Sequence, residues 1–169
     1  MDLMLYQVTD PGLCEGLLEL HKKGVKVTLL VSSCIDSASD TSAAEECYKN
    51  LTSAGFGDIY KTPSYYTFSC VISCFTSLTH LTSSDRHQKF WIIDGQRVSW
   101  STGNWSPTDY PAGTVFPPFG HSGWHDTNRD FTASIGNADM VSVFQNVLNE
   151  DKSRGTTWAS DPVLKCTWQ

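Results

Sequence analysis

Five polar residues between positions 87 and 104 have types and a spacing that could carry out chemistry. They are His87, Lys89, Asp94, Thr102 and Asn104, within the stretch HQKFWIIDGQRVSWSTGNW. An imidazole, an ammonium, a hydroxyl and a carboxamide can all donate hydrogen bonds. If these four groups lie together, they form a site suited to a phosphate ester, whose oxygens require donors and positive charge.

An Asp-Gly pair divides this stretch into two runs of β-branched and aromatic residues, which is a strong signal for a β-hairpin. With Asp-Gly at the centre of a two-residue turn, we expect His87 to pair with Thr102. By the same register, Lys89 pairs with Trp100. Because side chains alternate between the faces of a sheet, this pairing places four donors on one face, namely His87, Lys89, Thr102 and Asn104. A shift of one residue would distribute them over both faces.

The order of these residues resembles the signature of the phospholipase D superfamily. That signature has His-x-Lys, four residues, Asp, six residues, and a patch of small residues that ends in Asn, and it matches His87, Lys89, Asp94 and Asn104. The family has Gly-Ser where this chain has Ser101 and Thr102, so the hydroxyl is kept and the glycine is replaced. The tripeptide after the patch, Asn-Trp-Ser, is similar to eukaryotic branches of the family.

The resemblance implies that a phosphodiester is cleaved in two steps, without a metal or other cofactor. His87 would be the nucleophile that forms a covalent phosphohistidine, or the acid that protonates the leaving oxygen. Lys89 and Asn104 would hold the phosphate oxygens, and Thr102 would add a hydroxyl, so that these donors stabilise the charge of the transition state. The alternative for Lys89 is a solvated strand residue, and the alternative for Asp94 is a plain turn residue.

A second acidic residue, Asp130, matches the one that orients the histidine in related lobes. In that role it would fix the tautomer of the imidazole; alternatively, it forms an ion pair with Arg129. The chain holds one complete copy of this signature, whereas the family reaction uses two. The resemblance therefore implies a homodimer in which two copies of His87 face each other across a two-fold axis, or a second lobe that supplies the other motif.

The expected strands and helices alternate along the chain. We expect strands at 3–8, 25–32, 58–62 and 131–135, and helices that follow Asp10, cover 40–54 and follow Asn137. The inward stripe of the last helix would consist of Met140, Phe144, Val147 and Leu148. Strands alternating with helices, followed by the hairpin, predict an α/β fold with a mixed β-sheet and helices on both faces, as in a phospholipase D-like lobe.

Three segments fall outside this pattern. Residues 70–86 are an insertion, which is either intron sequence carried into the gene model or an ordinary extra loop. Residues 106–127 form a long loop that leaves directly from the small-residue patch and could line the substrate site. Residues 155–169 form an irregular tail, in which Trp158 and Trp168 are candidates for docking on the core. We therefore expect residues 1–169 to be a single lobe with its core at 3–150.

Composition limits the other properties of the chain. The 169 residues suffice for one domain, and the net charge of −6 argues against tight, non-specific binding to nucleic acid. No run of about 18 apolar residues occurs, so we expect no membrane-spanning helix. The first residues do not resemble a signal peptide, but the chain can also lack its native N-terminus, which leaves its localisation open. The six cysteines form no tight framework, so we expect reduced, buried thiols.

Two functions from different classes fit these patterns. The first is a phosphodiesterase that acts on a phospholipid, in lipid degradation, or on nucleic acid, as a nuclease. The second is a catalytically inactive phospholipase D-like lobe that serves as a binding or dimerisation module. The replaced glycine at Ser101 and the insertion favour the second function.

Overall fold

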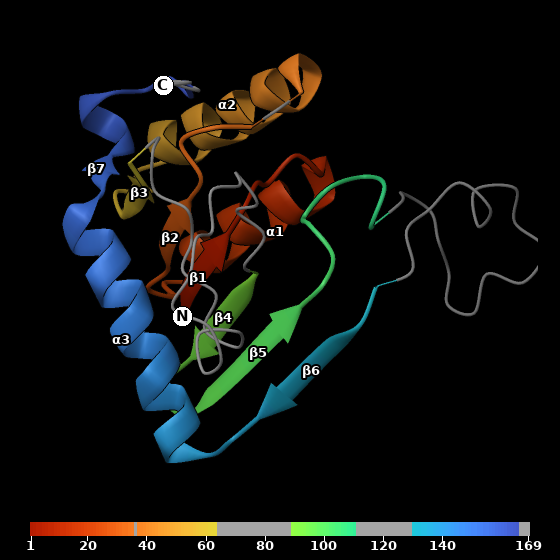
Figure 1. Ribbon diagram of the computed structural model, residues 1–169. Coiled ribbons are helices and arrows are strands. Elements are labelled where there is room, and N and C mark those ends of the chain that lie inside the picture. The colour runs from red at the N-terminus through yellow and green to blue at the C-terminus, as the bar shows by residue number, and fades with distance from the viewer. Residues whose placement is uncertain (36, 64–88, 111–129, 166–169) are drawn as a thin grey trace, which may run out of the picture.

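The computed structural model describes residues 1–35, 37–63, 89–110 and 130–165. Within these residues the chain forms one seven-stranded sheet and three α-helices (Figure 1). The strands are β1 (Asp2–Leu5), β2 (Thr28–Val31), β3 (Ile59–Lys61), β4 (Phe90–Ile93), β5 (Arg97–Ser101), β6 (Thr132–Ile135) and β7 (Thr156–Thr157). The helices are α1 (Pro11–Lys22), α2 (Ala38–Ser53) and α3 (Ala138–Arg154), and a short 3₁₀ helix, η2, covers Trp158–Ser160.

The sheet is mixed, as the sequence predicted. Its strand order is β6-β5-β4-β1-β2-β3-β7. β1, β2 and β3 run parallel to one another, whereas β4, β5, β6 and β7 each pair antiparallel with their neighbours. Two apolar clusters lie on the two faces of the sheet: one includes residues of α1 and α2, and the other includes residues of α3 (Figure 1). The fold is therefore α/β with helices on both faces.

The helices begin where their capping residues predict. Asp10 accepts a hydrogen bond from the backbone N–H of Leu13 at 2.8 Å, and Pro11 follows it in the first turn. Asn137 caps α3 in the same way, through the N–H of Met140 at 3.0 Å. The expectation that Met140 is buried is wrong, because its side chain is 39% exposed and the buried stripe begins one residue later, at Val141.

The hairpin is present, but its register differs from the prediction by one residue. Asp94 and Gly95 have φ values of 52° and 64°, and the N–H of Gln96 donates to the carbonyl of Ile93 at 3.0 Å. This is the tight turn that an Asp-Gly pair favours. The strand ladder, however, begins with Ile93 opposite Arg97. Gln96 is therefore an additional residue of the connection, and every pair after it is shifted by one.

The predicted pairing of Lys89 with Trp100 is consequently wrong. Trp100 pairs with Phe90, and Lys89 lies opposite Ser101, whose N–H donates to the Lys89 carbonyl at 2.9 Å. Under strict alternation this register would place Thr102 on the other face from Lys89. Because β5 ends at Ser101, the residues that follow leave the ladder and are free of that alternation.

A disulfide joins the two helices on one face of the sheet. Cys14 of α1 and Cys47 of α2 are bonded, with their Cα atoms 5.9 Å apart. Cys34 is disulfide-bonded as well. The expectation of reduced thiols is therefore wrong for these three cysteines. With a sequence separation of 33 residues, the Cys14–Cys47 cross-link contributes roughly 3–4 kcal/mol to the free energy of unfolding.

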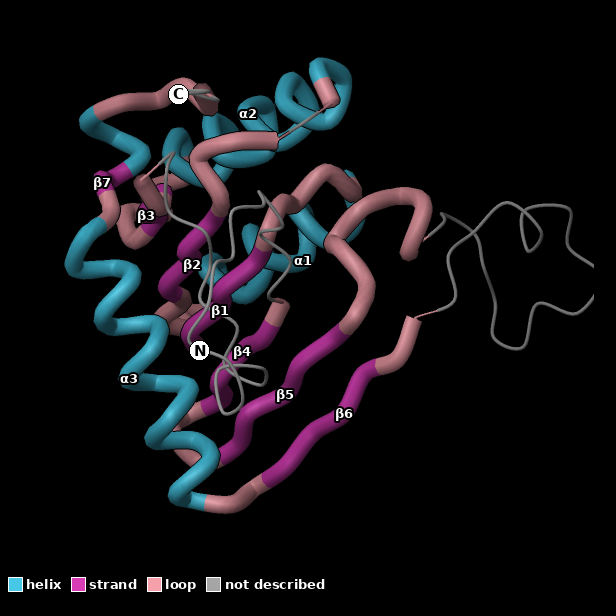
Figure 2. The backbone as a smooth tube through the Cα atoms, viewed as in Figure 1, coloured by secondary structure: helices cyan, strands magenta, loops and turns pink. Residues whose placement is uncertain are grey.

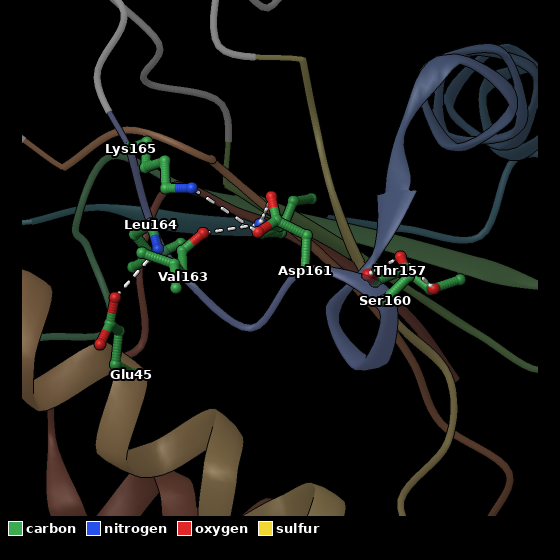
Figure 3. Close-up of polar contacts among 8 residues, drawn as sticks. Glu45, Thr157, Ser160, Asp161, Val163, Leu164 and Lys165 are labelled. Carbon is green, nitrogen blue, oxygen red and sulfur yellow. Dashed lines mark hydrogen bonds and ion pairs between the residues drawn. The ribbon is translucent and has the colours of Figure 1, made fainter.

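The segment after α3 is docked on the sheet, although we expected it to be irregular. β7 extends the sheet at β3, and Trp158 is only 2% exposed and packs edge-on against Tyr48. Figure 3 shows the residues that follow: the backbone N–H of Leu164 donates to Glu45 at 2.9 Å. The buried ammonium of Lys61 binds Asp161 at 2.8 Å. The second predicted tail residue, Trp168, lies outside the described residues.

Candidate active site

Most of the candidate residues that the structure describes meet at one edge of the sheet. Lys89 immediately precedes β4, the stretch Thr102–Asn104 follows β5, and Asp130 lies shortly before β6. These three strands are antiparallel neighbours, so the start of β4, the end of β5 and the start of β6 are adjacent (Figure 2). Sheet topology therefore brings together residues that are up to 41 positions apart (Lys89 to Asp130).

Lys89 is a buried cation at this edge. Its side chain is only 4% exposed, and its Nζ donates a hydrogen bond to the Thr102 carbonyl at 3.1 Å. Burial lowers the pKa of Lys89, whereas the nearby carboxylates of Asp109 and Asp130 act to raise it. The alternative that Lys89 is a solvated strand residue is therefore wrong. The side chain holds a positive charge where it is poorly shielded by water.

Thr102 connects this edge to Asp130. Its hydroxyl donates to Asp130 Oδ1 at 2.9 Å and accepts from the backbone N–H of Phe131 at 2.9 Å. A hydroxyl has a single proton to donate, and here that proton is directed at a carboxylate. In this structure Thr102 therefore holds Asp130 in place, and its hydroxyl has no second proton for a phosphate oxygen.

Close backbone approach occurs at Gly103, and not at the position where the family has its glycine. A Cβ at Gly103 would lie 2.7 Å from Asp130 Cγ and 2.8 Å from Asp130 Oδ2. Ser101, which replaces the family's glycine, fits without difficulty. It is buried, and its Oγ accepts from the N–H of Gly103 and from the hydroxyl of Thr132, each at 3.1 Å. The serine therefore supports the loop.

Asn104 presents an unsatisfied acceptor at the site. Its backbone N–H donates to Asp109 Oδ2 at 2.8 Å, while its side-chain Oδ1 is buried and has no hydrogen-bond partner among the residues that the structure describes. A buried polar atom without a partner costs about 1–3 kcal/mol, and such atoms call for a specific explanation. This oxygen needs a hydrogen-bond donor, whereas a phosphate oxygen would be bound by the amide nitrogen of the same side chain.

Asp109 belongs to this cluster, although the sequence analysis did not identify it. Its Oδ2, which accepts from the backbone N–H of Asn104, also accepts from the Ser106 hydroxyl at 2.8 Å. The signal was present in Ser106-Pro107-Thr108-Asp109, where an acid stands three residues after a serine, a spacing typical of a capped turn. The N–H of Asp109 indeed donates to the carbonyl of Ser106 at 3.1 Å, which closes that turn.

The two carboxylates of the cluster influence each other. Desolvation raises the pKa of Asp130, and the neighbouring Asp109 raises it further, while the hydrogen bond from Thr102 and the charge of Lys89 lower it. The net shift is upward. Among the described residues, the cluster thus contains one ammonium and two carboxylates, and Asp130 binds a proton more readily than an ordinary aspartate.

Two predicted site residues are not brought to this edge. Asp94 lies in the exposed turn at the far end of the hairpin, so the structure agrees with its alternative as a turn residue. His87 lies outside the described residues, as do Arg129, the insertion at 70–86 and positions 111–127 of the long loop.

No family model and no curated protein matches the chain. Among solved structures, the chain is similar to Nuc from Salmonella typhimurium, a phospholipase D family member, with a TM-score of 0.59 and 14% sequence identity over 93% of this chain and 81% of that one. It is also similar to NucT from Helicobacter pylori, with a TM-score of 0.58 and 12% identity over 92% of this chain and 80% of that one. The chain therefore has the fold of a phospholipase D-like lobe, as the spacing of its motif predicted.

No helix in the described part of the chain is both long enough and apolar enough to cross a membrane.

Proposed function

We propose that the protein is a phosphodiesterase of the phospholipase D type, which hydrolyses a phosphodiester of a phospholipid or a nucleic acid. The observation that supports this most strongly is the buried ammonium of Lys89 at the sheet edge that also carries Asn104, whose carboxamide nitrogen can donate to a phosphoryl oxygen. The two residues stand at the spacing of the phospholipase D signature, in a chain that has the phospholipase D fold.

In the proposed mechanism, His87 attacks phosphorus, a bond forms between its imidazole nitrogen and phosphorus, and the bond to the leaving oxygen breaks. A second histidine donates its proton to that oxygen. Water then attacks the phosphohistidine, the nitrogen–phosphorus bond breaks, and the second histidine accepts the proton of the water. Lys89 and Asn104 bind the phosphoryl oxygens throughout and stabilise their charge in the five-coordinate transition state.

The second histidine has to come from outside the motif at 87–104. A homodimer with a two-fold axis through the site would supply another copy of His87, and a separate lobe would supply an equivalent residue. Charge balance supports this arrangement, because the ammonium of Lys89 and the carboxylates of Asp109 and Asp130 do not by themselves favour the binding of an anion. A protonated histidine from the second motif adds the positive charge that a phosphodiester requires.

The proposal is tested by incubating the protein with bis(4-nitrophenyl) phosphate in the presence of EDTA, with its oligomeric state measured in the same buffer by light scattering. We expect turnover that persists with the chelator, and a phosphoryl group on His87 when the reaction is quenched in alkali and digested for mass spectrometry. The peptide that contains His21 serves as the internal control, because that ring packs against Phe56, away from the site.

The opposite results have clear meanings. The absence of turnover in a confirmed dimer would favour the inactive binding or dimerisation module. Turnover that is lost with EDTA would contradict the metal-independent mechanism. If the protein turns over the chromogenic substrate, vesicles of an anionic phospholipid and single-stranded oligonucleotides, offered as competing substrates, distinguish a phospholipase from a nuclease.

A further inference from the structure

We propose that Asp109 is a positioning residue of this site, which fixes the loop that carries Asn104 and provides a counter-charge for Lys89. The inference rests on the proposed function and extends it to a residue outside the phospholipase D signature.

Two hydrogen bonds from described residues to Asp109 act on the loop that carries Asn104. Its Oδ2 accepts from the backbone N–H of Asn104 and from the hydroxyl of Ser106, both at 2.8 Å. Ser106 is buried, and its carbonyl accepts from the N–H groups of Asp109 and Tyr110 at 3.1 and 2.8 Å. A carboxylate that receives a backbone and a hydroxyl donor makes strong, charge-assisted bonds. Asp109 therefore sets the direction in which the chain leaves Asn104.

The rest of the loop is held from two other sides. Asp130 binds the hydroxyl of Thr102 at 2.9 Å on one side. On the other side, the carbonyl of Trp105 accepts from the N–H groups of Thr9 and Asp10 at 2.8 and 3.0 Å, which ties the loop to the segment between β1 and α1. Of these connections, the hydrogen bond to Asp109 is the one that holds the backbone of Asn104 itself. Without it, the backbone of Asn104 loses its anchor.

Asp109 also influences the charges of its neighbours. In the described part of the chain, the charged groups that interact with it are Lys89 at the start of β4 and Asp130 before β6. Asp109 acts to raise the pKa of both, because its negative charge favours protonated neighbours. Neutralising Asp109 should therefore lower both pKa values. In the proposed mechanism the two limbs of a pH profile belong to the two histidines, and the loss of a negative charge at the site they share lowers their pKa values too, so both limbs move to lower pH.

The test is the pH dependence of kcat/KM for bis(4-nitrophenyl) phosphate in the Asp109→Asn variant. We expect a loss of at least about tenfold, since misplacing a positioned group by a fraction of an ångström has effects of this order, and a shift of both limbs to lower pH. Ser106→Ala removes one hydrogen bond to Asp109 but leaves the negative charge of Asp109 in place. This variant should therefore lower kcat/KM without moving either limb of the pH profile. Asp139→Asn, an exposed carboxylate in the first turn of α3, is the matched control and should change neither.

A second readout separates this inference from the proposed function. Hydrogen exchange at the Asn104 amide, measured by NMR, should be at least about tenfold faster in Asp109→Asn than in the wild type, because the N–H loses a charged acceptor. This holds whether or not the protein is an enzyme. A wild type without turnover would refute the proposed function alone. Unchanged exchange at Asn104, or an active Asp109→Asn variant with unshifted limbs, would refute the role of Asp109.

Discussion

Replacing Lys89 with methionine is expected to lower kcat/KM for a phosphodiester by roughly 10²–10³-fold, the usual effect of removing one donor that stabilises transition-state charge. Methionine fills a similar volume, so the buried position stays occupied. The substitution removes only the ammonium, whose Nζ lies 3.1 Å from the Thr102 carbonyl in a residue that is 4% exposed. The measurement is steady-state hydrolysis of bis(4-nitrophenyl) phosphate.

The same substitution should change how stability depends on pH. Lys89 acts to lower the pKa of Asp130, so in Lys89→Met that pKa, already raised, rises further. A carboxyl group whose pKa is higher in the folded state contributes stability at low pH, and this contribution is lost as the pH increases through the folded-state pKa. The variant should therefore lose more of its free energy of unfolding at pH 8 than at pH 5, in urea titrations.

Lys23→Met, at an exposed position after α1, provides the control for both measurements. Activity of Lys89→Met within tenfold of the wild type would mean that the ammonium does not act on the substrate. A loss of stability that is the same at both pH values would mean that Lys89 does not interact with Asp130.

Replacing Gly103 with alanine is expected to reduce kcat/KM by about 100-fold, because displacing a catalytic loop by about 1 Å has effects of this order. The added Cβ would lie 2.7 Å from Asp130 Cγ and 2.8 Å from Asp130 Oδ2, closer than non-bonded atoms approach. Either Asp130 or the loop that carries Asn104 has to move. Because the atoms that clash belong to the exposed side chain of Asp130, the free energy of unfolding should fall by at most about 1–3 kcal/mol, the usual cost of overpacking a core.

A double-mutant cycle identifies the cause of that loss. If the clash is with Asp130, the destabilisation by Gly103→Ala should largely disappear in an Asp130→Ala background, although activity should not return. Gly57→Ala is the matched control, because a Cβ there meets no atom within 4 Å. An equal loss of stability with and without the Asp130 carboxylate would contradict the close approach on which this prediction rests.

The sequence predicted those parts of the fold that depend on local chemistry. Asp10 and Asn137 cap the helices that were expected to follow them, and Asp94 and Gly95 form the expected turn. The register was missed because the pairing depends on whether Gln96 joins the ladder, and the hydrophobic pattern does not determine this. The packing of Trp158 was only suggested, because its partner Tyr48 is more than a hundred positions away and no periodicity marks such a contact.

The site shows the same division between local and long-range information. The motif spacing indicated Lys89 and Asn104, and the resemblance to related lobes indicated Asp130. The ends of three antiparallel strands bring these residues to one edge. Asp109 was missed because its role depends on a turn that bends it back onto the Asn104 amide. The Cys14–Cys47 disulfide was missed for a similar reason, since only the packing of α1 against α2 brings the two sulfur atoms together.

Whether this sheet edge binds a phosphoryl group is tested most directly by a crystal structure of the protein with tungstate, an analogue of the transferred phosphoryl group. We expect one tungstate at the edge formed by β4, β5 and β6, with its oxygens within hydrogen-bond distance of Lys89 Nζ and of the Asn104 carboxamide. Tungstate bound only elsewhere, or no tungstate at this edge at a saturating concentration, would contradict it.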